Sequence, residues 1–188
     1  MKFLDWFPDI EVKGKKLDKY YKVIFGLIAA SFSGFYLYTS GFGLVSSETN
    51  RAFYLLFTAI LVFLSYPLGK KSLTGKPTVL DFILIFFVTI SILYWVDQYV
   101  PYAINRVSSP NKWDTIMGVI AILTIIETSR RVLGWAIPII AAVFLLQLYY
   151  GAYLPGKLSH SGLPLIRIIE FTFSTQEAMF GVITSTFA

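Results

Sequence analysis

The sequence predicts an all-α, polytopic helical membrane protein with about five transmembrane helices plus interfacial helices. Two observations carry this prediction. Hydrophobic residues make up 56% of the 188 residues and charged residues only 14%, whereas soluble domains carry about 25% charged residues. The apolar residues also come in long blocks without a formal charge, and about 18 such residues form a helix that crosses the roughly 30 Å hydrocarbon layer.

Five blocks are expected to span the membrane, namely residues 23–44, 52–69, 79–100, 113–131 and 132–154. The last two adjoin without turn residues, and one straight helix over residues 113–150 would be about 57 Å long. Because that length does not stand upright in a bilayer, we expect a sharp break between Arg131 and Gly134. The alternative is one bent helix and four spans.

Segments outside these blocks are expected at the membrane surface. Residues 1–22 read as a cytoplasmic or interfacial lead, with aromatic residues near its start and lysines after them. Residues 163–173 read as a short amphipathic helix with Arg167 and Glu170 on one side, lying at the interface. The sequence stops in what reads as the start of another apolar segment, so we expect a truncated chain, a split protein or one piece of a larger one.

The basic residues predict the orientation. Six fall in the lead, three in the turn at 70–76 and two at Arg130 and Arg131, which places eleven on one side of the five-span arrangement. The other side carries five, namely Arg51, Arg106, Lys112, Lys157 and Arg167. Since positive charge is retained in the cytoplasm, we expect the N-terminus and Arg130 to be cytoplasmic.

Several classes of function are excluded by composition. The chain has no cysteine and a single histidine, His160, so cysteine-ligated metal, thiolate catalysis and a bis-histidine haem are impossible within it. Asp81 and Asp97 lie at opposite ends of one span, too far apart to share a metal ion. No basic stripe with interleaved aromatic residues indicates nucleic acid. We therefore expect no enzyme activity, no cofactor and no metal site.

Small residues recur every fourth position in the first span, at Gly26, Ala30 and Gly34. This spacing lets a second helix approach closely. The alternative interpretation is the ordinary composition of a glycine-rich helix.

Charge is concentrated in one stretch, TIIETSRRVLGW, at residues 124–135. Glu127 lies three residues before Arg130 and four before Arg131, so both pairs share a helix face. We interpret them as a structural ion pair at the interface, where arginine reaches water at low cost, with Gly134 and Pro138 forming the break that follows. Ion coupling through Glu127 and contact with a partner are the alternatives.

The second half of the chain resembles a known family. The resemblance rests on IIETSRRVLGWAIPIIAAVFLL, YGAYLPGKLSHSG and IRIIEFTFSTQEAMFGVITSTFA. These segments are similar to the N-terminal part of the fused membrane permeases of TRAP (tripartite ATP-independent periplasmic) transporters, and look closest to the TAXI branch. The matching positions are Glu127, Thr128, Arg130, Arg131, Gly134, Tyr149, Leu154, Pro155, Gly156, Phe180 and Gly181, with departures at Ser129 and Met179. The resemblance covers residues 113–188; earlier residues match only in hydropathy and in NRAFYLLF.

The resemblance implies a function. Such permeases lie in the bacterial inner membrane and import small organic acids, which a periplasmic binding protein delivers and an ion gradient drives. Residues 23–131 would be the small four-helix portion, and residues 132–188 the first helix and interfacial arm of the large portion. The implied partners are the remainder of the large portion, the binding protein and membrane lipid. Substrate and coupling-ion residues would lie outside this chain, which would serve as scaffold. The alternative is a membrane assembly subunit without transport function.

Overall fold

The computed structural model describes residues 18–43, 45–66, 68, 76–153, 155, 159–181 and 184. Most of the aromatic and lysine-rich lead and most of the turn at 70–76 lie outside these residues. The described elements are α1 (Lys19–Phe42), α2 (Ser47–Ser65), α3 (Val79–Asn105), α4 (Lys112–Leu133), α5 (Ala136–Tyr150), the 3-10 turn η2 (Gly151–Tyr153), α6 (Leu165–Ile169) and the π-helical turn η4 (Glu170–Ser174). Every described element is helical, as predicted.

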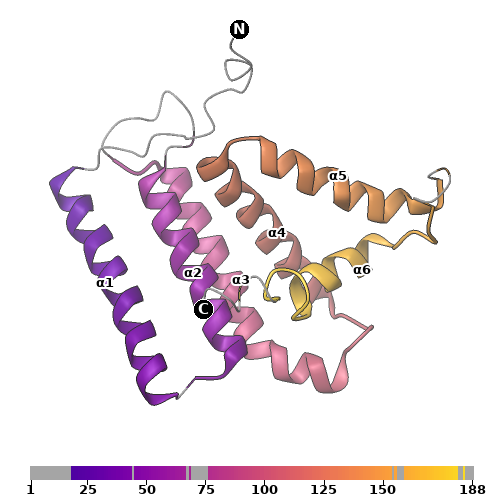
Figure 1. Ribbon diagram of the computed structural model, residues 1–188, viewed down its shortest axis with the longest axis horizontal. Helices are drawn as coiled ribbons and strands as arrows, with labels where there is room; N and C mark the ends of the chain where they lie inside the picture. Colours follow the sequence, from indigo (N-terminus) through magenta and orange to yellow (C-terminus); the bar gives the residue numbers. More distant parts are fainter. Residues whose placement is uncertain are drawn as a thin grey trace, which may run out of the picture.

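The protein is a helical membrane protein. α1, α3 and the stretch Ala136–Tyr153 are long and apolar enough to cross a bilayer. α2 and α4 have 19 and 22 residues, or about 28 and 33 Å, and they run beside α3 (Figure 1). α2 and α4 carry more polar residues than the other three, and the number of spans, five or four, stays a prediction.

The core lies where α2, α3 and α4 meet. Its buried members are Ala52, Leu56, Ala59 and Phe63 from α2, Val88, Ile92 and Trp95 from α3, Ala121 from α4, and Phe173 and Phe180 from the C-terminal segment. α1 packs only at the edge of this core, through Phe32 and Phe35 against Phe57 of α2. The bundle proper is thus three helices, with α1 along its outer side (Figure 1).

The small residues of α1 face outward. Gly26, Ala30 and Gly34 are exposed, and a Cβ atom added at Gly26 or Gly34 would meet no described atom within 4 Å. No element of the described chain therefore uses this stripe, and the predicted close helix approach would involve another molecule.

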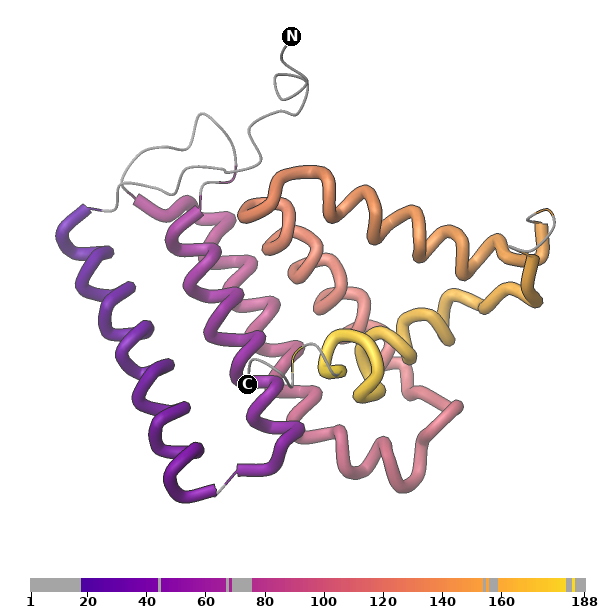
Figure 2. Tube along the Cα trace, in the orientation of Figure 1, coloured from indigo at the N-terminus to yellow at the C-terminus, as the bar shows by residue number. Residues whose placement is uncertain are grey.

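The expected break between Arg131 and Gly134 is confirmed. α4 ends at Leu133, and Gly134 follows with φ 73° and ψ −160°, a left-handed conformation that suits glycine. α5 begins two residues later, with Pro138 buried in its first turn, where a missing backbone N–H costs no helical hydrogen bond. Gly134 alone makes the break, and Pro138 starts the next helix. α5 then leaves the bundle at a wide angle (Figures 1 and 2).

The chain returns from the far end of α5 to the bundle (Figure 2). The predicted interfacial helix at 163–173 is α6 with most of η4, and it docks on α4. Its location at the membrane interface stays a prediction. A Cβ atom added at Gly118 of α4 would lie 2.6 Å from Cγ2 of Ile169 and 3.3 Å from Cβ of Phe173. Residues 176–180 continue across α2, where Arg51 Nη1 donates to the carbonyl of Phe180 at 2.9 Å.

Candidate functional site

The predicted charged stretch belongs to a buried ion-pair network that joins three helices. At its centre, Nη1 of Arg131 donates to Oδ1 of Asp81 at 2.6 Å, and both side chains are fully buried. Asp81 lies in the first turn of α3, where its other oxygen accepts the backbone N–H of Thr78 at 2.7 Å. Asp81 therefore caps α3 and binds the end of α4 at once.

Glu127 forms the second half of this network. Its Oε1 accepts from Nη2 of Arg130 at 2.7 Å and from Nε of Arg131 at 2.9 Å, while its Oε2 accepts from Nε of Arg130 at 2.6 Å. The pairing of Glu127 with Arg130 is thus bidentate, the stronger geometry for a guanidinium and a carboxylate. Glu127 therefore pairs with Arg130 and with Arg131 at the same time, as the helical spacing predicted.

The two arginines also bind the chain that leaves α2. Nη2 of Arg130 donates to the carbonyl of Leu68 at 3.0 Å, and Nη1 of Arg131 donates to the carbonyl of Tyr66 at 3.3 Å. The guanidinium of Arg131 lies over the ring of Phe63, and that of Arg130 over the ring of Trp135. The network therefore fastens the end of α2, the start of α3 and the break after α4 to one another.

The expectation that both arginines reach water is wrong for Arg131. Arg131 is 1% exposed, whereas the side chain of Arg130 is 20% exposed. The reason is Asp81, a partner that sequence reasoning missed. The pairing of Asp81 with a residue 50 positions away leaves no local signal in the sequence.

Among the described residues, two carboxylates of the network face two guanidinium groups, and arginine stays protonated in proteins. Removing one member of a buried pair costs about 3 to 5 kcal/mol, because the other charge is left uncompensated. The arrangement is suited to fixing helix positions.

A second network closes the opposite end of α3. One carboxylate oxygen of Glu170 accepts from the hydroxyl of Tyr102 and, at 2.7 Å, from the backbone N–H of Ser108. Its other oxygen accepts from Nη1 of Arg167 at 2.7 Å. Burial raises the pKa of Glu170, but the hydrogen bonds from Tyr102, Arg167 and Ser108 outweigh it and hold the pKa below its ordinary value.

Ser108 explains why Glu170 is needed there. It has φ 71°, a left-handed conformation uncommon for residues other than glycine. The hydrogen bond from its N–H to the buried carboxylate holds this turn between α3 and α4 against η4. Sequence reasoning placed Arg167 and Glu170 on one side of a surface helix and did not anticipate this contact.

Asp114 ties α4 to α3 beside this turn. Its oxygens accept from the Tyr94 hydroxyl at 2.7 Å, from Nη1 of Arg106 at 3.1 Å and from the backbone N–H of Asn111 at 2.7 Å. Nη2 of Arg106 in turn donates to Oε1 of Gln98 at 2.8 Å. Asp114 thus begins α4 much as Asp81 begins α3.

Two cavities lie near these elements. One, of about 490 Å³, is lined by apolar and tyrosine side chains of α4, α5 and α6. The other, of about 10 Å³, lies between α3, α4 and η4. The ion-pair network of Asp81 and Glu127 lines neither.

No metal site is found in the described part of the chain, which holds no group of three His, Asp or Glu side chains able to share an ion. His160 stacks its ring on Gly151, and its Nδ1 accepts the backbone N–H of Gly162 at 3.1 Å. Its contacts are those of a residue that shapes the turn between α5 and α6.

Comparison with known proteins identifies no relative. No protein-family model, no curated protein and no solved structure matches the chain.

Proposed function

We propose that this chain is the stationary membrane scaffold of a secondary transporter that imports small organic acids. The transporter would lie in the bacterial inner membrane, with the N-terminus of this chain in the cytoplasm. It would act with the remainder of a large permease portion, with a periplasmic binding protein and with an ion gradient. The resemblance of residues 113–188 to fused TRAP permeases motivates the proposal.

The observation that carries the proposal is the buried pair of Asp81 and Arg131. A scaffold against which another portion moves must keep its own helices in register. The pair fixes α4 against α3 at one end, and the contacts of Asp114 and Glu170 fix them at the other. These charged groups serve the fold and leave substrate handling to the partner portion.

The cavities support the same assignment. The cavity of about 490 Å³ is lined by apolar side chains and two tyrosines and by no charged side chain, so it offers no cation to pair with a carboxylate ligand. The cavity of about 10 Å³ is too small for an organic acid. We therefore propose that the substrate and the coupling ion bind to the remainder of the permease.

A membrane assembly subunit without transport function is the second candidate. The observation that favours it is that Asp81, Glu127 and Glu170 each pair with an arginine of the described chain, so none of these carboxylates requires a ligand. A transporter scaffold is required for uptake by the remainder of the permease, whereas an assembly subunit is not. A transport measurement therefore separates the two candidates.

The test is uptake by proteoliposomes that carry a binding protein and an imposed sodium or proton gradient. The 188-residue chain alone should give no uptake. The chain joined to, or combined with, the remainder of the permease should restore it, and the remainder alone should not. Specific uptake by the chain alone would contradict the scaffold assignment, and full activity of the remainder alone would favour the assembly subunit.

A further inference from the structure

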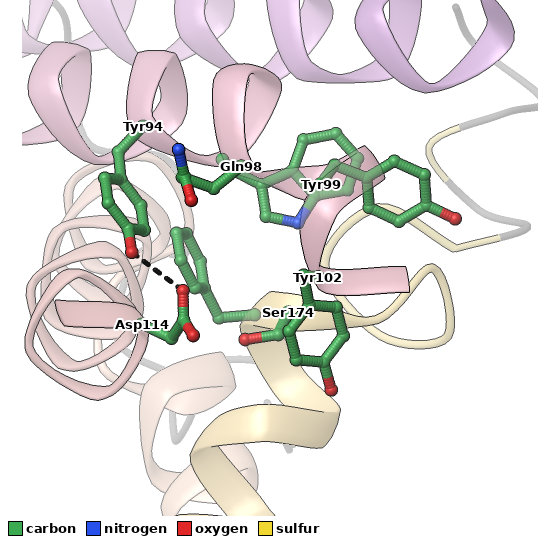
Figure 3. A pocket seen from close by; sticks show the side chains of 8 residues that line it. Tyr94, Gln98, Tyr99, Tyr102, Asp114 and Ser174 are labelled. Carbon is green, nitrogen blue, oxygen red and sulfur yellow. Dashed lines mark hydrogen bonds between the residues drawn. The ribbon is translucent and has the colours of Figure 1, made fainter. Parts of the chain in front are cut away.

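The small cavity between α3, α4 and η4 has mostly apolar walls in which a few polar side chains are set. Figure 3 shows Tyr94, Gln98 and Tyr102 of α3, Asp114 of α4 and Ser174 of η4 around it. Trp95, Tyr99 and Phe173 complete the lining. The cavity lies at the junction where the returning C-terminal segment meets the bundle.

The indole N–H of Trp95, in one wall of the cavity, is a buried donor without a described acceptor. Trp95 is 3% exposed, and its Nε1 has no hydrogen-bond partner among the residues that the structure describes. The indole cannot turn away, because its ring stacks on that of Phe180 at 3.8 Å between centroids and lies tilted against that of Tyr99 at 4.8 Å. An N–H held in this way is costly unless something accepts from it.

We propose that this cavity is a binding site for one water molecule, which accepts the Nε1 hydrogen of Trp95 and bridges it to η4. The cavity volume of about 10 Å³ is close to the smallest space that holds a single water. Buried waters make about three hydrogen bonds. The hydroxyl of Ser174 and the oxygens of Asp114 and Gln98 are the partners that the lining offers.

The donors around the cavity select water over a sodium ion. A cation would face the indole N–H of Trp95, which presents a positive hydrogen. It would also compete with Arg106, whose guanidinium already binds Asp114 at 3.1 Å and Gln98 at 2.8 Å. A neutral molecule that both accepts and donates satisfies these walls without displacing the arginine.

The water would give the returning segment a polar link to the bundle. Ser174 ends η4, and Phe173 and Phe180 of the same segment are buried in the core. Glu170 already binds the turn at Ser108, and Arg51 binds the carbonyl of Phe180. The bound water would add a third polar contact between these two, where Ser174 lies against α3.

The test is nuclear magnetic resonance of the chain in detergent micelles with 15N-labelled tryptophan. The indole N–H of Trp95, assigned by its loss in Trp95→Phe, should show a cross-peak to a long-lived water. The indole of Trp135, which is 65% exposed, serves as the control for rapidly exchanging solvent. Replacing sodium by choline in the buffer should leave the Trp95 resonance unchanged.

Substitution at Ser174 makes the test specific. Ser174→Val fills the space and should abolish the water cross-peak, whereas Ser174→Ala keeps the space and should retain the cross-peak with a shifted indole resonance. The proposal is overturned if Trp95 shows no water cross-peak in the unmodified chain, or if its resonance moves on replacement of sodium. If Ser174→Val does not fold, Ser174→Ala alone tests the proposal, through its retained water cross-peak and its shifted indole resonance.

Discussion

Arg131 and Asp81 are 50 positions apart, yet Nη1 of the arginine lies 2.6 Å from Oδ1 of the aspartate, and both side chains are fully buried. The contact joins the last turn of α4 to the first turn of α3. The charge of Arg131 can be buried because the carboxylate of Asp81 compensates it.

Loss of either member of the Asp81–Arg131 pair should destabilise the protein strongly. Asp81→Asn and Arg131→Gln should each cost about 3 to 5 kcal/mol, because each leaves one uncompensated buried charge. The double variant should cost less than the sum of the two, since it leaves neither charge behind. Thermal midpoints in detergent for the two single variants and the double variant measure this. Strict additivity would show that the pair does not act as a unit.

Arg130 and Arg131 should differ in their effect, although they are neighbours. Arg131→Leu removes the guanidinium that pairs with buried Asp81 and should lower folded yield and melting temperature sharply, whereas Arg130→Leu removes a contact that is partly exposed and should be milder. Replacing both should be at least as severe as Arg131→Leu, without changing the Michaelis constant of the complete transporter. Detergent-extracted yield, melting temperature and uptake are measured for each variant.

Glu127→Gln keeps the size of the side chain and one acceptor oxygen, so its effect on stability should be smaller than that of Arg131→Leu. Its uptake in the complete transporter should follow its folded yield. A Glu127→Gln protein with normal yield and melting temperature but no ion-driven uptake would place Glu127 in coupling and refute its structural role.

Docking of the C-terminal segment should weaken in acid through Glu170. Its pKa in the folded protein is lowered from 4.5, so the carboxylate contributes stability that is fully present above the unfolded pKa and is lost as the pH falls through the folded pKa. Melting temperature should therefore hold above about pH 5 and fall below it, with a smaller fall in Glu170→Gln. Glu177→Gln, at an exposed position, is the matched control and should keep the acid sensitivity.

Gly118 should tolerate no side chain, unlike Gly34. A Cβ atom at Gly118 would lie 2.6 Å from Cγ2 of Ile169, whereas one at Gly34 would meet nothing within 4 Å. Gly118→Ala should lower the melting temperature and expose residues 165–181 to proteolysis. Gly34→Ala should be neutral or stabilise by up to about 1 kcal/mol, the usual gain within a helix. Equal effects at the two glycines would contradict the observed docking.

Cysteine labelling tests the membrane topology. The experiment is straightforward because the chain has no natural cysteine. Single cysteines at Ser46, Ser108 and Ser159 should react with an impermeant thiol reagent added outside, and one at Ser72 should not. Labelling of position 72 and not of position 46 would reverse the orientation. Protection of position 159 alone would favour the alternative of four spans, in which residues 113–150 form one bent helix.

The sequence by itself determined the features that depend on local spacing. Long apolar blocks placed the five long helices, and three of these blocks, 23–44, 52–69 and 132–154, carry no formal charge. A segment in lipid forms a helix because it must satisfy its own backbone. The excessive length of residues 113–150 required a break, and Gly134 makes it. Glu127 pairs with Arg130 and Arg131 because residues three and four apart share a helix face.

Only the tertiary structure decided the contacts between distant segments. The burial of Arg131 against Asp81, the docking of Glu170 on the turn at Ser108 and the wide departure of α5 from α4 are absent from the local pattern. Helix periodicity fixes which face of a helix is apolar, but in a membrane nearly all faces are apolar, so the pattern does not say which helices meet. Here the polar groups at the helix ends decide it, because each buried charge must find its partner wherever along the chain that partner lies.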